Sequence, residues 1–360
     1  MMNLNSLRIA LTFAGCFLGA GFVSGQELWQ FFASFGLKGL FGLVLSMSLL
    51  FVFGVLLMRL ANNSGFCESD KLIIRKNNKI LRAFVGVATV FFLFGIAVIM
   101  SSGVGALFEQ QWGIHGSIAS SVFAVLVFIL ALGGHERLVN VFSVTVPVLV
   151  VFTVAIGILA YIRFPYSNAE SFSQLQNETN PLLGSWWVSA LTFVSYNLFS
   201  SVEIIAPFGN AVNNKRRTVL GIALGSGFLL LIALCIFLSM YLCPESVAKD
   251  LPMLYVASVI SPVLASFYAV LLILGMLGTA LSSLVGAIHF LCEKYIWMKN
   301  NKIAVVAVMS SLMFVCGLVG FGELIGTVYP ICGYFGIAAL VLMIEHMVHI
   351  KIKGKNNDRI

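Results

Sequence analysis

The feature that most limits how this chain folds is a series of apolar runs, most of them about 20 residues or longer. Windows of that length place ten runs at roughly 7–35, 38–60, 81–108, 116–133, 138–162, 185–208, 218–242, 254–290, 303–320 and 323–347. With 60% hydrophobic residues, 10% charged residues and a mean hydropathy of +1.01, the chain exceeds what a soluble core can hide. The sequence therefore predicts an all-α polytopic membrane protein with ten transmembrane helices.

The basic residues predict the orientation of these helices. Of the 21 Lys and Arg residues, only Lys38, Arg163 and Lys249 fall in loops on the side opposite the N-terminus. Because basic residues are retained on the cytoplasmic side, both termini are expected to be cytoplasmic. The basic excess behind the net charge of +7 lies in alternate loops, as in membrane proteins. It therefore does not indicate a nucleic-acid partner.

The first apolar run contains a stretch that is hard to keep helical, GCFLGAGFVSGQELWQFF at 15–32. Each glycine costs about 1 kcal/mol against alanine inside a helix, so a break is expected here. Peptide groups freed at membrane depth are tolerated only where they are buried in protein or line a cavity. Glu27 adds a carboxylate, which costs several kcal/mol in an apolar span unless it is protonated, paired or solvated. The stretch is therefore interpreted as half of a ligand site.

The sixth run is also polar in its middle, SYNLFSSVEIIAPFGN at 195–210, and is expected to be broken like the first. SSGVGAL at 101–107 in the third run is matched by SSLVGAI at 282–288 in the eighth, which crosses in the opposite direction. This favours an inverted five-plus-five repeat, although small residues also recur by chance in apolar helices. The predicted parts are a first half at 1–163, an outer loop at 164–184, a second half at 185–350 and a basic cytoplasmic tail at 351–360.

The eighth run places small and hydroxyl-bearing residues at spacings of three and four, on one helical face. They are Gly275, Thr279, Ser282, Ser283 and Gly286. Such oxygen atoms suit a hard monovalent cation, but the hydroxyls can equally bond back to their own helix. This run is longer than one span and contains Pro262, so its first part is expected to form a separate outer helix.

Two carboxyls lie within the broken runs, Glu27 and Glu203. Either can act as a proton carrier in coupling or gating, because burial favours the protonated form of a carboxyl. Either can instead be a structural acceptor for unwound backbone. No pairing of nucleophile and base and no nucleotide-binding loop is visible, so an enzyme is not expected.

At this point the sequence resembles a known superfamily. Gly19-Ala20-Gly21 in the first run, Phe199 to Glu203 in the sixth and the five-plus-five count look like the amino acid/polyamine/organocation (APC) transporters with the LeuT-type fold. Within that superfamily, GAGFVSGQELWQFF looks most like the YkvI-like bacterial membrane proteins. The resemblance covers essentially all runs, and it implies a location in the bacterial cytoplasmic membrane.

Carried over by position, the resemblance implies a substrate site between the first and sixth runs and a sodium site between the first and eighth. The implied substrate residues are Phe17, Ala20, Gly21, Phe22, Ser24, Tyr196, Asn197, Phe199, Ser200 and Ser201, and the implied Na⁺ ligands are Gly15, Leu18, Thr279, Ser282 and Ser283. The substrate carboxylate would lie on the amides around Ala20, Gly21 and Phe22. Ser201 stands where many relatives have glycine, so the break in the sixth run is expected to be tighter or less complete.

The expectation is a secondary active transporter, Na⁺-coupled, for an amino acid or a similar small zwitterionic or amine solute, with no other cofactor. Two alternatives stay open. One is proton coupling through Glu27 or Glu203, and the other is a ligand sensor that binds without transport.

Overall fold

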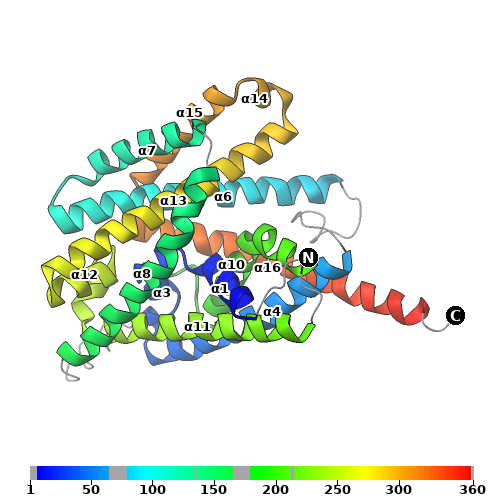
Figure 1. Ribbon diagram of the computed structural model, residues 1–360, viewed down its shortest axis with the longest axis horizontal. Coiled ribbons are helices and arrows are strands. Elements are labelled where there is room, and N and C mark those ends of the chain that lie inside the picture. Colours follow the sequence, from blue (N-terminus) through cyan, green and yellow to red (C-terminus); the bar gives the residue numbers. More distant parts are fainter. Residues whose placement is uncertain (1–5, 65–78, 134–135, 165–178, 212–214, 358–360) are drawn as a thin grey trace.

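The computed structural model is a helical bundle in which residues 6–64, 79–133, 136–164, 179–211 and 215–357 are described (Figure 1). No strand occurs within these ranges. The α-helices are α1 (Ser6–Phe17), α2 (Ala20–Val23), α3 (Gln26–Phe31), α4 (Leu37–Ser64), α6 (Lys79–Trp112), α7 (Gly116–Leu132), α8 (Glu136–Arg163), α10 (Trp186–Ala211), α11 (Lys215–Leu242), α12 (Pro252–Ile260), α13 (Pro262–Lys294), α14 (Ile296–Asn300), α15 (Lys302–Gly317) and α16 (Phe321–Asn357). Short 3-10 helices, η1 (Ala33–Phe35) and η4 (Pro244–Ala248), precede α4 and α12.

The first apolar run is broken, as predicted. Helix α1 ends at Phe17, and Gly19 is extended with φ −78° and ψ 168°. A second break follows at Gly25, whose φ of +89° lies in the left-handed region that favours glycine. The run therefore consists of three short helices rather than one span.

The sixth run is not broken, so that part of the predicted fold was wrong. Helix α10 continues from Trp186 through Ala211. Its polar side chains bond back to its own carbonyls: Ser200 donates to Asn197 O at 2.8 Å, and Ser201 donates to Leu198 O at 3.1 Å. The hydroxyls of Ser200 and Ser201 therefore find their hydrogen-bond acceptors within an intact helix. The sequence has no glycine between 195 and 202 that could supply a turn.

The eighth run divides as expected. Helix α12 ends at Ile260, and Pro262 opens α13, where proline fits because the first helical N–H has no intrahelical partner. Helix α13 then runs for 33 residues to Lys294. The separate first helix expected for this run is confirmed, and its outer position stays a prediction.

The helices form two packed groups (Figure 1). In one group α6 packs on α13, and both pack on α7 and α15. In the other group α1 packs on α11, and α10 packs on α4. In the predicted halves, these last two pairs are reciprocal: the first helix of each half lies against the second helix of the other. An inverted repeat predicts this reciprocal packing. The exact boundaries of the two halves stay a prediction. Much of the 164–184 loop lies outside the described residues.

The number of membrane crossings is supported only in part. By length and composition, five described helices can span a membrane, in the segments Leu37–Asn62, Ala83–Trp112, Arg216–Leu242, Pro262–Lys294 and Phe321–His346. Four shorter apolar helical segments, Ser6–Phe17, Gly116–Leu132, Pro147–Arg163 and Lys302–Gly317, accompany them in the described part of the chain. The polytopic membrane architecture is confirmed, and the count of ten remains a prediction.

Substitution of Gly25 tests the second break. A Cβ at this position would lie 3.3 Å from both Met253 Cγ and Pro252 Cβ, and a left-handed backbone costs a non-glycine residue about 1–2 kcal/mol. We expect Gly25→Ala to lower the thermal unfolding temperature of the purified protein. Gly227→Ala on α11, where nothing lies within 4 Å of the added Cβ, is the control and is expected to be neutral or slightly stabilising. Equal stability of Gly25→Ala and the unmodified protein would contradict the break.

Candidate functional site

The strongest candidate site is built around Glu27 on α3. Its side chain is only 5% exposed, and one carboxyl oxygen, Oε1, accepts a hydrogen bond from the Tyr196 hydroxyl of α10. The other oxygen, Oε2, lies 3.2 Å from the point where a Cβ on Gly21 would stand, and Tyr329 Oη of α16 lies 3.7 Å from that point. Because Gly21 has no side chain, it leaves room for a carboxyl that α3, α10 and α16 enclose.

Aromatic rings surround this carboxyl. Tyr196 and Tyr329 are stacked, with ring centroids 4.8 Å apart and planes at 14°. The ring of Phe92 on α6 lies 6.1 Å from Tyr196 and 6.4 Å from Tyr329, and Phe31 lies 5.5 Å from Tyr196. All of these side chains are buried, so the carboxyl sits in an aromatic, water-poor enclosure.

No basic side chain balances Glu27 among the described residues. The groups that act on its carboxyl are the Tyr196 hydroxyl and the side chain of Asn197, both neutral. An ionised carboxyl inside a membrane protein is costly unless it is paired. The negative charge of Glu27 is therefore neutralised only when the carboxyl holds a proton or when a cation enters the site.

The carbonyls freed by the Gly25 break have defined partners. Tyr268 of α13 donates its hydroxyl to Val23 O at 2.7 Å, and the amide of Met253 in α12 donates to Ser24 O at 2.9 Å. Ser24 itself donates to Gly21 O at 2.8 Å. Ser24, predicted as a substrate residue, thus supports the broken backbone, and α12 and α13 fix the position of α3.

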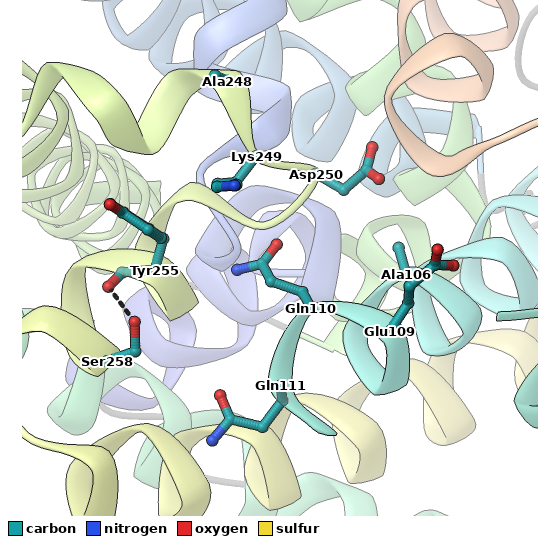
Figure 2. Close-up of a pocket in the computed structure, with 9 residues that line it drawn as sticks. All are labelled: Ala106, Glu109, Gln110, Gln111, Ala248, Lys249, Asp250, Tyr255 and Ser258. Atoms are coloured by element: carbon teal, nitrogen blue, oxygen red, sulfur yellow. Dashed lines mark hydrogen bonds between the residues drawn. The ribbon is translucent and has the colours of Figure 1, made fainter. Parts of the chain in front are cut away.

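A cavity of about 470 Å³ lies beside this arrangement, at the end of the bundle formed by η4 and α12 (Figure 2). Figure 2 shows Gln110 of α6 below Lys249 and Asp250 of the segment between η4 and α12, and Glu109 and Gln111 line the cavity from the same helix. The remaining lining residues are Ala106, Ala248, Tyr255 and Ser258. This end of the bundle is the outer one in the predicted orientation.

Gln110 ties that segment to α6. Its Nε2 donates to Leu251 O at 3.0 Å, and its Oε1 accepts from Leu251 N at 3.1 Å. Together with the bond from Met253 to Ser24, these contacts hold α12 against α3. The Glu27 site is therefore covered at the α12 end.

Asp250 is the electrostatically unusual group of the cavity. Partial burial and the nearby carboxyls of Glu109 and Glu323 raise its pKa above the ordinary 3.8, while the Gly322 amide, which donates to Asp250 Oδ1 at 3.3 Å, acts in the opposite direction. The three carboxyls come from α6, the segment before α12, and α16. The α12 end therefore carries a concentration of negative charge.

Several predicted substrate residues make contacts with residues other than Glu27. Phe17 packs on Phe13 with ring centroids 4.9 Å apart, and the side chain of Asn197 also donates to Phe193 O at 3.0 Å. Phe22 lies 6.4 Å from Phe193, and Phe199 lies 6.3 Å from Phe92. Of the predicted substrate residues, the structure brings Gly21, Tyr196 and Asn197 together at Glu27.

Two of the predicted sodium ligands already have hydrogen-bond partners. Thr279 donates to Gly275 O at 2.9 Å, and Ser282 donates to Thr279 O at 3.1 Å, so both hydroxyls bond to their own helix. Ser282 is exposed while Ser283 is buried. Gly15 of α1 is exposed, Leu18 is buried, and α13 packs on α2. The sodium site stays a prediction, and the side chain of Glu203 lies outside the described residues.

Sequence reasoning missed Tyr329, Phe92 and Gln110. Tyr329 carried one usable signal, since a phenol within the last apolar run needs a polar partner when buried. Phe92 and Gln110 carried none, because their roles depend on helices that are distant in the sequence.

Comparisons with known proteins agree with this architecture. No protein-family model matches the chain. It is 25% identical over 337 residues to the uncharacterised membrane protein YkvI of Bacillus subtilis, covering 92% of this chain and 93% of the relative. It is 24% identical to the uncharacterised protein YyaD of the same organism, covering 96% of this chain and 98% of the relative.

Solved transporters share the fold at low sequence identity. A Na⁺-coupled sialic acid symporter in a substrate-bound outward-open state has a TM-score of 0.57 at 12% identity, covering 88% of this chain and 72% of its own. Mhp1 in its inward-facing conformation scores 0.58 at 15% identity, with 94% and 75% covered. The Eremococcus coleocola manganese transporter scores 0.57 at 12% identity, with 95% and 78% covered.

The pH dependence of stability tests the environment of Asp250. A carboxyl with a raised pKa binds protons more readily in the folded protein than in the unfolded chain, so its contribution favours folding at low pH and is lost as the pH rises above 3.8. We expect Asp250→Asn, which is neutral throughout, to unfold at a higher temperature than the unmodified protein at pH 7. The difference should shrink as the pH is lowered towards 4.

Ser48→Ala, which removes an exposed hydroxyl on α4 that does not titrate, is the control for that experiment and should leave the pH profile unchanged. A constant difference between Asp250→Asn and the unmodified protein at every pH would contradict the assignment.

The geometry and the comparisons agree on the fold class predicted from the sequence, apart from the intact sixth run. The chain is a polytopic membrane protein with the LeuT-type fold, and it is similar along nearly its whole length to YkvI of Bacillus subtilis.

Proposed function

We propose that this protein is a secondary active transporter for a small amine-bearing solute, an amino acid or a related amine, and that it works by alternating access. The observation that carries the proposal is the buried, unbalanced carboxyl of Glu27 at a broken helix, enclosed by α3, α10 and α16. Half-helix ends and freed carbonyls near the middle of a membrane protein serve as ligand sites. Solved proteins of this fold include a symporter and a metal transporter, which supports the same class.

The two helix groups supply the moving parts. The short helices α2 and α3 lie beside both groups, because α2 packs on α6 and α13 and α3 packs on α10 and α11. Opening the α12 end requires the bonds of Gln110 to Leu251 and of Met253 to Ser24 to break. A ligand shifts such an equilibrium only by binding one state more tightly than the other.

Sodium is the first candidate for the coupling ion. The predicted ligands are the carbonyls of Gly15 and Leu18 with the hydroxyls of Thr279, Ser282 and Ser283. A sodium ion would replace the bonds that Thr279 and Ser282 make to their own helix and would join α1 to α13. The Na⁺-coupled sialic acid symporter of the same fold supports this candidate.

A specific observation favours a second candidate, the proton. Glu27 is 5% exposed and has no basic partner among the described residues, so protonation neutralises a charge that nothing else in the site balances. In this version the hydroxyls of α13 are structural, and Glu27 carries the coupling proton.

Uptake into proteoliposomes separates these candidates. A panel of radiolabelled amino acids and simple amines is offered under an inward sodium gradient or under a pH gradient without sodium. Sodium coupling predicts uptake only in the first case, and tighter solute binding in sodium by about 5- to 150-fold, with the same factor for sodium binding in the presence of solute. Thr279→Ala should abolish that mutual effect, while Ser48→Ala, an exposed hydroxyl on α4, should retain it.

Uptake driven by the pH gradient alone, and lost in Glu27→Gln, would assign the coupling to the proton. If a panel compound binds the purified protein but no gradient drives its uptake, the transporter proposal is wrong and the sensor alternative holds.

A further inference from the structure

The position of the Glu27 carboxyl bears on which solute the site accepts. The resemblance to the APC superfamily implies that a substrate carboxylate lies on the amides around Ala20, Gly21 and Phe22. In the structure, Glu27 Oε2 already lies 3.2 Å from the Cβ position of Gly21. The chain therefore places its own carboxyl beside the segment expected to receive the carboxylate of a substrate.

A second carboxylate in this enclosure would be unfavourable. The polar groups around Glu27 are the hydroxyls of Tyr196 and Tyr329 and the amide of Asn197, and no basic side chain joins them in the described part of the chain. Like charges brought together in a buried site cost several kcal/mol. A zwitterion would bring its carboxylate close to Glu27 without a cation to balance the pair.

The aromatic rings suit the opposite charge. Tyr196, Tyr329 and Phe92 lie within 6.4 Å of one another by ring centroid, and all three are buried. An ammonium group over an aromatic face is attracted by the ring, and more strongly when desolvated, in addition to its attraction to a carboxylate. The enclosure therefore combines one negative charge with ring faces that attract a cation.

The cavity at the α12 end has a small excess of negative charge. Glu109 and Asp250 line it together with one basic residue, Lys249, and Glu323 lies near Asp250. An excess of one sign of charge raises the local concentration of the opposite ion. The cavity volume of about 470 Å³ falls within the range of small-molecule sites.

We propose that the solute is a cationic amine without a carboxylate, and that Glu27 supplies its counter-ion inside the ring of Tyr196, Tyr329 and Phe92. This inference rests on the proposed transport function and narrows the substrate class of the same site. The ammonium group binds the ionised form of Glu27, so proton and amine compete for one carboxyl.

Pairs of compounds that differ only by a carboxylate test the substrate class. Purified protein is titrated with phenethylamine and phenylalanine, isopentylamine and leucine, histamine and histidine, and cadaverine and lysine, with calorimetry and thermal unfolding as readouts. At least one amine should bind, and its amino acid should bind about 100-fold more weakly or not at all. An amino acid that binds as tightly as its amine overturns the inference and leaves the transporter proposal intact.

Substitution of Glu27 tests the counter-ion. Glu27→Gln keeps an acceptor for the Tyr196 hydroxyl but removes the charge, so amine binding should weaken by about 100-fold. Glu27→Asp keeps the charge and should retain the preference for amines, which covers the case in which Glu27→Gln does not fold. Glu293→Gln, an exposed carboxyl on α13, should bind like the unmodified protein.

Three outcomes overturn the inference. They are unchanged amine affinity in Glu27→Gln, loss of the amine preference in a folded Glu27→Asp, and no binding by any amine of the panel. Failure of the proposed function is seen separately, as amine binding to the purified protein without uptake into proteoliposomes.

Discussion

The structure depends on how the peptide groups freed at Gly25 are satisfied inside a membrane protein. A carbonyl that has lost its helical partner must find another donor, because lipid offers none. Tyr268 supplies one hydroxyl, to Val23 O, and Met253 supplies one amide, to Ser24 O. These two bonds join α12 and α13 to the broken first run and orient α3 so that Glu27 points towards α10 and α16.

The first and sixth runs show which local signals predict a break. The first run has glycine at three closely spaced positions, Gly19, Gly21 and Gly25, and the left-handed backbone at Gly25 suits no other residue as well. The sixth run has serines in the corresponding place, and Ser200 and Ser201 bond to carbonyls three residues earlier, which an intact helix allows. Polar residues alone therefore did not predict a break, whereas glycine in a required conformation did.

Single residues of the candidate site could be predicted from the sequence where a polar group stands out within one apolar run. Glu27 in an apolar span and Tyr196 in the polar sixth run were both found from the sequence, but their mutual hydrogen bond joins residues 169 positions apart. The stacking of Tyr329 on Tyr196 and the bonds of Gln110 to Leu251 depend on how α6, α12 and α16 pack. Periodicity within one helix contains no information on such contacts. The spacing of Ser282 and Ser283 likewise left open that one is exposed and the other buried.

The short length of α3 links the site to its cover. Glu27 stands two residues after Gly25, and the Cβ position of Gly25 lies 3.3 Å from side-chain atoms of Met253 and Pro252 at the start of α12. A charge that enters beside Glu27 pulls on a helix of six residues whose N-terminal cap, Gly25, contacts that cover. Because packed interfaces change between discrete arrangements rather than deform continuously, a small displacement of α3 and the release of α12 from α6 belong to one transition. Binding of a cation or proton at Glu27 and opening of the α12 end then depend on the same conformational equilibrium. A shared equilibrium is the requirement for coupling between the two events.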